Sequence, residues 1–282
     1  MSRGVERATW VRLGTLRGTL HLHTAADALV IRPWLQESLD RQMEGRVPVG
    51  LDRLTEATVE ILADGPVEQR ELTERLSARF SGTPSDLWVA ARVVVPLVQL
   101  APRGTWGGSG PVVLDLLERH VGGTMRTPTT EDVVRRYLRA YGPAAASDLS
   151  VWSGVTRLRP VLTRMADLVR HEGPDGKELF DLPGAPLSDE DVPAPVRLLG
   201  QYDEVWLAHA ARDRVTGPGT RGAWMGGTGA VSHAVFVDGW LTGLWRPMDG
   251  RVTVTELFRD LSPAERADLD EEIERVDAMM AP

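Results

Sequence analysis

Hydrophobic and polar residues alternate along the stretch from Leu16 to His23. The even positions are apolar or small, and the odd positions carry Arg17, Thr19, His21 and His23. A period of two is typical of a half-buried strand, so this stretch is predicted to be a strand with one polar face.

A helix is predicted directly after that strand. Thr24 is followed by Asp27 three residues later, which is a variant of the capping box and places the helix start at Ala25. We expect Pro33 to break or kink this helix, because proline removes a backbone N–H.

Helical periodicity returns in two stretches that resemble one another. One helix is predicted from Asp52 to Asp64 and ends at Gly65-Pro66, and another begins at Thr129 or Thr130 and ends at Gly142-Pro143. The two Gly-Pro pairs lie 77 residues apart, as do Leu72 and Leu149. This constant offset indicates an internal repeat.

Each copy of the repeat continues with the same predicted elements: a short helix, a longer apolar helix and an extended segment. In the first copy these cover 67–76, 86–98 and 100–110, and in the second copy 144–152, 156–169 and 169–182. Asp175-Gly176 in the last segment is a strong hairpin signal. Three helices followed by a hairpin are typical of a winged helix, a variant of the helix-turn-helix.

The C-terminal third has a different pattern. Three alternating stretches, 231–237, 240–246 and 252–257, are separated by Asp-Gly turns and predict an antiparallel meander. Ser262, Pro263 and Glu265 then supply the capping residue, first-turn proline and capping-box partner of a closing helix. The proline-rich, acidic stretch from Asp189 to Pro195 is interpreted as a linker.

These patterns predict a mainly α protein of the α+β class, with tandem winged helices, a C-terminal antiparallel meander and a closing helix. The predicted division has four parts: a remnant of a first winged-helix module at 1–48, winged helices at 49–112 and 125–187, and the meander with its helix at 195–282.

Composition limits the classes of function. The chain has no cysteine, which excludes disulfides, Cys-ligated metal sites and thiol nucleophiles. No apolar stretch is long enough for a membrane span or a signal peptide, so we expect a cytoplasmic protein.

A formal net charge of −8 argues against nucleic-acid binding, yet the charge is unevenly distributed. Lys177 is the only lysine among 32 basic residues, and eight of the arginines lie between Arg126 and Arg170. Arginine forks suit phosphates and base edges, and local charge rather than net charge steers a polyanion.

Three motifs carry a resemblance to a known family. They are R-G-T-L-H-L-H-T-A-A-D from Arg17, L-L-G-Q-Y-D-E-V-W-L-A-H from Leu198, and V-F-V-D-G-W-L-T-G-L-W-R ending at Arg246. The chain resembles the AlkZ-like winged-helix DNA glycosylases over nearly its whole length. The resemblance implies tandem winged helices around double-stranded DNA, excision of alkylated or cross-linked bases, and no metal or other cofactor. We expect a monomer associated with the nucleoid.

The sequence departs from that family at the catalytic motif. The family's Gln-x-Gln or Gln-x-Asp motif precedes the R-G-T-L-H-L strand, but only sixteen residues stand before Arg17 and no Gln-x-Gln occurs. The chain is interpreted either as shortened at its start or as a non-catalytic relative. Gln201-Tyr202-Asp203 has Gln-x-Asp spacing elsewhere, which makes Asp203 the candidate catalytic carboxylate. Its alternative role is an ion pair with Arg212 or Arg214.

Candidate DNA-binding residues come from several places in the chain. They are Arg17, Thr19, His21 and His23 on the predicted strand, Arg92 and Arg103 in the first copy, Arg157, Arg159 and Arg164 on the predicted third helix of the second copy, and Arg212, Arg214 and Arg246 further on. Purely structural roles remain open for the strand face and for the helix surface. The His-x-His pair lacks a third ligand nearby, so no metal site is predicted.

Three functions are compatible with the sequence. The first is a DNA-repair glycosylase relative, the second a DNA-binding protein or regulator without glycosylase activity, and the third an interaction module whose acidic surface meets a protein partner. A shared fold cannot choose among them.

Overall fold

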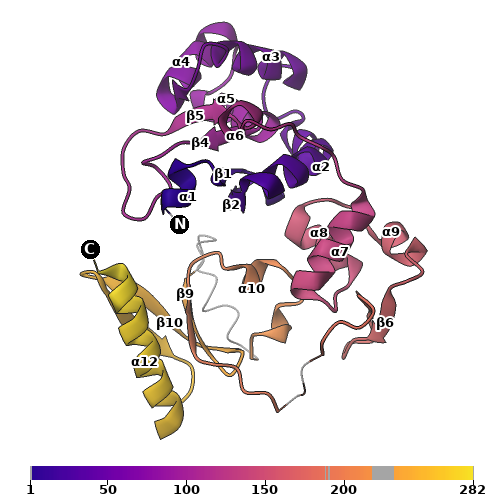
Figure 1. Cartoon of the computed structure of the whole chain (residues 1–282), viewed down its shortest axis with the longest axis vertical. Coiled ribbons are helices and arrows are strands. Elements are labelled where there is room, and N and C mark those ends of the chain that lie inside the picture. Colours follow the sequence, from indigo (N-terminus) through magenta and orange to yellow (C-terminus); the bar gives the residue numbers. More distant parts are fainter. Residues whose placement is uncertain (1, 188, 190, 218–231, 282) are drawn as a thin grey trace. The chain divides into compact units, whose positions relative to one another are not determined.

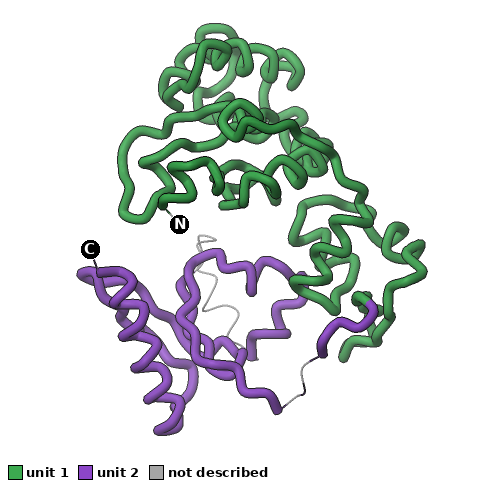
Figure 2. The backbone as a smooth tube through the Cα atoms, in the orientation of Figure 1, with its two compact units in different colours: residues 1–182 green, residues 183–282 purple. Residues whose placement is uncertain are grey.

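The structure is a computed structural model that describes residues 2–187, 189, 191–217 and 232–281. The chain forms two units, Met1–Leu182 and Pro183–Pro282 (Figure 2). Both combine α-helices with antiparallel sheets, which confirms the predicted α+β class (Figure 1). The finer four-part division stays a prediction, and residues from both 1–48 and 49–112 contribute to one sheet.

That sheet has five antiparallel strands in the order β2-β1-β4-β5-β3. The strands are β1 (Trp10–Gly14), β2 (Leu20–Thr24), β3 (Val67–Glu68), β4 (Leu97–Gln99) and β5 (Val113–Leu116). The accompanying helices are α1 (Ser2–Glu6), α2 (Ala25–Met43), α3 (Leu51–Ile61), α4 (Gln69–Arg79), α5 (Pro84–Val94) and α6 (Leu117–Val121). Val11, Leu13 and Val98 of the sheet are buried together with Ala28 and Leu117, so α2 and α6 cover its apolar face.

The predicted strand from Leu16 to His23 is wrong in its first half. Leu16–Gly18 forms a short 3-10 turn, η1, between β1 and β2. Arg17 and Gly18 have φ values of 58° and 71°, a left-handed conformation that an extended strand cannot contain. The polar alternation therefore spans a hairpin turn as well as a strand.

Of the break or kink predicted at Pro33, the break is wrong, because α2 continues through this residue to Met43. Proline at this position cannot donate to the carbonyl of Leu29, four residues earlier. The backbone N–H of Arg126 donates to that carbonyl over 3.0 Å, so the freed acceptor stays satisfied. The predicted start of the helix is confirmed, since Thr24 Oγ1 accepts from the backbone N–H of Asp27.

The two copies of the sequence repeat share an order of elements. The first runs α3, β3, α4, α5, β4 and β5. The second runs α7 (Thr130–Tyr141), α8 (Ala146–Ser153), α9 (Arg159–Arg164), β6 (Val169–Glu172) and β7 (Glu178–Asp181), and the bridge between Ala144 and Phe180 occupies the position of β3. The capping box that starts α7 pairs Thr129 with Asp132.

The third helix of each copy is shorter than its sequence pattern predicts. Helix α5 ends at Val94, because Pro96 disfavours helical geometry at Val95, which is extended. The glycine-rich stretch 100–110, predicted to be extended, is instead a loop of turns between β4 and β5. Helix α9 begins only at Arg159, since Arg157 has a φ of 63° and lies outside the helix.

Unit 2 contains a four-stranded antiparallel sheet in the order β11-β10-β9-β8. It consists of β8 (Arg197–Leu199), β9 (His233–Val237), β10 (Trp240–Met248) and β11 (Arg251–Leu257), with the short helices α10 (Glu204–Leu207) and η2 (Arg212–Arg214). The three predicted strands are present, although Val231 lies outside the described residues, and β8 joins them because Leu198 pairs with Val235. Strand β8 was not predicted from the sequence, because it is too short to show an alternation of hydrophobic and polar residues.

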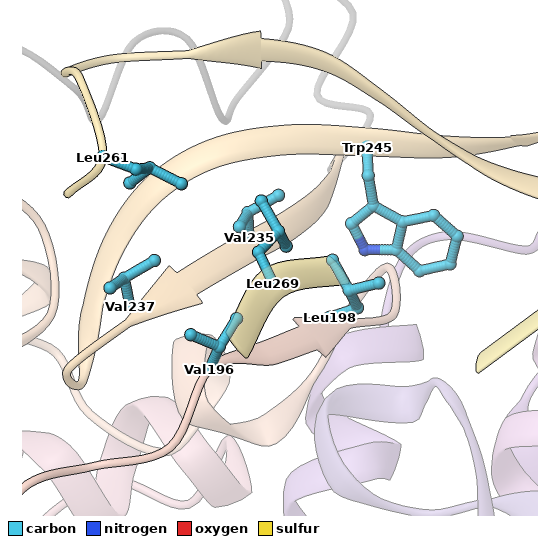
Figure 3. Close-up of a cluster of buried hydrophobic side chains, with 7 residues drawn as sticks. All are labelled: Val196, Leu198, Val235, Val237, Trp245, Leu261 and Leu269. Atoms are coloured by element: carbon cyan, nitrogen blue, oxygen red, sulfur yellow. The ribbon is translucent and has the colours of Figure 1, made fainter. Parts of the chain in front are cut away.

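Helix α12 (Pro263–Met280) closes unit 2 over this sheet. Its capping box is formed as predicted, with Ser262 Oγ accepting from the backbone N–H of Glu265. Leu269 joins the buried side chains Val196, Leu198, Val235, Val237, Trp245 and Leu261 (Figure 3). The stretch Asp189–Pro195 has neither helix nor strand in its described residues and belongs to unit 2.

Candidate nucleic-acid interface

Arg92 and Arg103, both predicted to bind DNA, line one pocket of about 600 Å³ in unit 1. Arg92 lies in the last turn of α5 and Arg103 in the loop between β4 and β5. The other lining residues are Arg12, Leu20, Gln69, Trp88, Gln99, Gly104, Thr105, Gly108 and Val112. The pocket therefore gathers polar side chains that lie far apart in the sequence.

Arg12 and Gln99, which both line this pocket, contact one another. They stand opposite one another in the register of β1 and β4, and Arg12 Nη1 donates to Gln99 Oε1 over 2.6 Å. Burial and the nearby Arg103 lower the pKa of Arg12, and burial lowers the pKa of Arg92. Sequence reasoning missed Arg12, Gln69 and Gln99. The alternation of W-V-R-L-G from Trp10 was the available signal, because it puts Arg12 on the face opposite Val11 and Leu13.

The polar residues around β2 lie together, but their side chains are engaged with their surroundings. His23 Nε2 lies 2.9 Å from Thr15 Oγ1, and Thr19 Oγ1 donates to the carbonyl of Leu16. The ring of His21 lies beside that of His23, with 5.9 Å between centroids.

Arg17 connects this region to the second repeat. Its Nη1 donates to the carbonyl of Trp152, and its Nη2 lies 3.4 Å from His21 Nε2. Ser38 Oγ of α2 donates to the carbonyl of Gly154 in the same neighbourhood. These contacts fasten the end of α8 to the first part of unit 1.

The arginines on and beside α9 differ in whether they form an ion pair with a carboxylate. Arg159 lies 3.6 Å from Glu178, which also pairs with Arg170. Arg157 and Arg164 are exposed and, within the described residues, have no carboxylate within 4 Å. Arg157 does not share the helix with Arg159 and Arg164, contrary to the prediction that all three lie on it.

Asp203 occupies the N-cap of α10, where its Oδ1 accepts from the backbone N–H of Val205 over 2.9 Å. Among the described residues neither Arg212 nor Arg214 is within 4 Å of this carboxylate, so the ion pair named as its alternative role is not formed with either arginine. Both arginines lie in η2, and Arg212 Nη1 donates to the carbonyl of His209. A cap on so short a helix orients the carboxylate and leaves it half-buried.

Arg246 lines a second pocket, of about 410 Å³, in unit 2. Its neighbours there include Gln201, His233, Trp245 and Thr255. The His233 and Trp245 rings are 4.6 Å apart, and burial lowers the pKa of His233. Gln201, two residues before Asp203 in the Gln-x-Asp triplet, thus lines the same pocket as Arg246.

In the part of the chain that the structure describes, no three His, Asp or Glu side chains form a group able to hold a metal ion. Nor does any described helix combine the length and apolarity needed to cross a membrane.

Comparison with known proteins identifies the family. The model of the family described as "DNA glycosylase AlkZ-like" matches residues 1–279. An interstrand DNA cross-link repair glycosylase of Streptomyces sahachiroi is 29% identical over an aligned length of 289 positions, and the alignment covers 90% of this chain and 75% of the relative. The solved structure of Streptomyces sahachiroi DNA glycosylase AlkZ shares the fold, with a TM-score of 0.76, 23% identity, and coverage of 98% of this chain and 81% of that one. The chain therefore belongs to the AlkZ-like DNA glycosylase family.

Proposed function

We propose that this protein is a DNA-repair glycosylase relative that acts on alkylated or cross-linked bases in double-stranded DNA. The observation that carries the proposal is the family match, which extends over residues 1–279 and so includes both units. The name of the Streptomyces relative, an interstrand DNA cross-link repair glycosylase, indicates the class of lesion.

Tandem winged helices are part of the proposal. The shared order of a helix, a short strand or bridge, two helices and a two-stranded hairpin supports it. In such modules the third helix commonly enters the major groove. Arg157, Arg159 and Arg164 lie on or beside α9, the third helix of the second repeat, and would contact phosphates or base edges there.

The proposed reaction is hydrolysis of the bond between a damaged base and its deoxyribose. Water adds to C1′ of the sugar, the bond to the base breaks, and one water proton leaves. An N7-alkylated guanine is already cationic, so it departs as a neutral base without being protonated. The required protein group is one that positions water and stabilises positive charge on the sugar.

Asp203 is the proposed carboxylate for this step. Its Oδ1 is fixed by the N-cap of α10, which leaves Oδ2 to orient water. The remaining proposed DNA contacts are Arg17, Thr19, His21 and His23 around β2, Arg212 and Arg214 in η2, and Arg246 on β10. A monomeric state, a location at the cytoplasmic nucleoid and independence of cofactors belong to the same proposal.

The test is release of base from damaged DNA. The purified chain is incubated with methylated duplex DNA and with a duplex that carries an interstrand cross-link. Free 7-methylguanine is measured by mass spectrometry, and unhooking is measured on denaturing gels. We expect both products to form with time. Salt-dependent duplex binding without either product would instead identify a non-catalytic DNA-binding protein.

Two variants separate the two roles of Asp203. Asp203→Asn keeps a capping oxygen but removes the charge, so we expect it to fold normally and to lose at least about tenfold in rate. Asp203→Ala loses the cap as well and should also lower stability by about 1 kcal/mol. Full activity in Asp203→Asn would assign the residue to capping alone.

A further inference from the structure

The pocket lined by Arg12, Arg92 and Arg103 is built from several elements of unit 1, which include β2 through Leu20 and α4 through Gln69. Arg12 comes from β1, Arg92 and Trp88 from α5, Gln99 from β4, and Arg103 from the loop between β4 and β5. Its volume of about 600 Å³ lies in the range typical of small-ligand sites.

The charge of this pocket is unbalanced. Three guanidinium groups line it, and none of its lining residues is Asp or Glu. Elsewhere in unit 1 arginines pair with carboxylates, as Arg79 does with Glu60 over 2.7 Å and Arg135 does with Asp167. Among the described residues, neither Arg92 nor Arg103 has a carboxylate within 4 Å. Gathering cations without an anion is costly, so an anion bound in the pocket would stabilise the cluster.

Arg92 gives the most direct sign of a missing partner. Its Nε is buried and, within the described part of the chain, has no hydrogen-bond partner. A buried donor left without an acceptor costs free energy, and within the described residues no carboxylate holds the guanidinium group of Arg92. Arg12 differs from Arg92, because it already donates to Gln99 Oε1. The side-chain amide nitrogen of Gln99, Nε2, is then a further hydrogen-bond donor beside the arginines.

We infer that this pocket binds a phosphoryl group, and that in the cell the group is a backbone phosphate of the DNA. The planar forks of arginine match phosphate oxygens in geometry and charge. The pocket is unsuited to hydrolysis of the glycosidic bond, because three cations would oppose the positive charge that develops on the sugar. The anion site stands on its own geometry, whereas its assignment to DNA rests on the proposed function.

Binding of inorganic phosphate tests the anion site by itself. Calorimetric titration of the full chain compares wild type with Arg103→Gln, Arg92→Gln and Arg92→Lys. Arg103 is exposed, so its substitution leaves the fold intact. Arg79→Gln is the control, because Arg79 is paired with Glu60 and lies outside the pocket. We expect each Gln variant to weaken phosphate binding about tenfold, and the control to match wild type.

Duplex DNA then distinguishes the source of the phosphate. Binding of undamaged duplex is measured at several salt concentrations, and loss of one phosphate contact should reduce the slope of log K against log salt by about 1. We expect this reduction in Arg92→Gln and Arg103→Gln but not in Arg79→Gln. Weakened phosphate binding with an unchanged duplex slope would overturn the DNA assignment and identify a site for free phosphate or a mononucleotide.

Two further outcomes separate this inference from the proposed function. If wild type binds phosphate through the pocket but binds no duplex, the anion site stands and the proposed function fails. If Arg103→Gln and Arg92→Gln match wild type in both titrations, the phosphoryl site itself is overturned.

Discussion

Arg136 of α7 forms a bidentate ion pair with Asp27 of α2. Nη1 donates to Oδ1 over 2.7 Å, and Nη2 lies 2.7 Å from Oδ2. The two residues are 109 positions apart in sequence and join the second repeat to the first part of unit 1. The hydrogen bond from Arg136 also lowers the pKa of Asp27.

This pair should contribute to the stability of unit 1. Because the Arg136 side chain is 55% exposed, we expect Arg136→Ala to lower the free energy of unfolding by only about 0.5–1 kcal/mol. A double-mutant cycle with Asp27→Ala, followed by urea denaturation, measures the coupling. A coupling energy near zero would show that the contact adds nothing in solution.

Acid should weaken the start of α12 through Glu265. A hydrogen bond from Arg259, together with the capping contacts at Ser262, lowers the pKa of Glu265 to about 2, from 4.5 in an unperturbed glutamate. A lowered folded-state pKa contributes stability that is complete above about pH 4.5 and is lost as the pH falls toward 2.

Comparison of wild type with Glu265→Gln isolates that contribution. We expect wild type to be more stable at neutral pH, and the difference to shrink progressively below about pH 4.5. Chemical denaturation at a series of pH values, followed by circular dichroism, measures it. A difference that does not vary with pH would contradict the role of the charge.

Glu272 is a buried carboxylate that ties α12 to β8. Its side chain is 7% exposed, its Oε1 accepts from the backbone N–H of Leu198 over 3.3 Å, and Oε2 pairs with Arg275. We expect Glu272→Ala to destabilise unit 2 by about 2–3 kcal/mol, because it removes an acceptor from a buried N–H and a partner from Arg275. The neighbouring Glu271 is exposed, so Glu271→Ala should change stability by less than about 0.5 kcal/mol. Equal losses in the two variants of the adjacent glutamates, measured by thermal denaturation, would refute this assignment.

The arginines beside α9 should contribute to DNA affinity according to their pairing. Arg157 and Arg164 are exposed and have no carboxylate within 4 Å in the described structure, whereas Arg135 is held by Asp167. We expect Arg157→Gln and Arg164→Gln each to weaken duplex binding and to reduce its salt slope by about 1, with Arg135→Gln as the matched control. Fluorescence anisotropy with labelled duplex measures both quantities. Equal effects in all three variants would indicate a loss of general charge rather than specific contacts.

Local patterns predicted those elements whose signals are local. Thr24 and Ser262 start helices because their side-chain oxygens accept the N–H of the residue three positions later. The Asp238-Gly239 and Asp249-Gly250 turns connect β9, β10 and β11, since both residues of each turn take a positive φ. The continuation of α2 through Pro33 could not be predicted. The carbonyl of Leu29 that proline leaves without a donor accepts from the backbone N–H of Arg126, which is distant in sequence.

The candidate site likewise combines residues that the sequence predicted with contacts that it could not predict. The sequence named Arg92 and Arg103 separately, as isolated basic residues in one repeat. Their convergence with Arg12 and Gln99 depends on the pairing of β1 with β4, which no local pattern specifies. The role of Asp203 as an N-cap depends on α10, a helix too short to show a periodicity.

The amino-acid sequence by itself determined the α+β class, the capped helix starts and the C-terminal meander, because each depends on residues a few positions apart. It also determined the repeated order of elements, because the same local patterns recur 77 residues later. Only the tertiary structure decided which arginines share a pocket, which are neutralised by carboxylates and which strand joins the meander at its edge. Those outcomes depend on contacts between segments far apart along the chain, where the free energy of burial and ion pairing selects the partner.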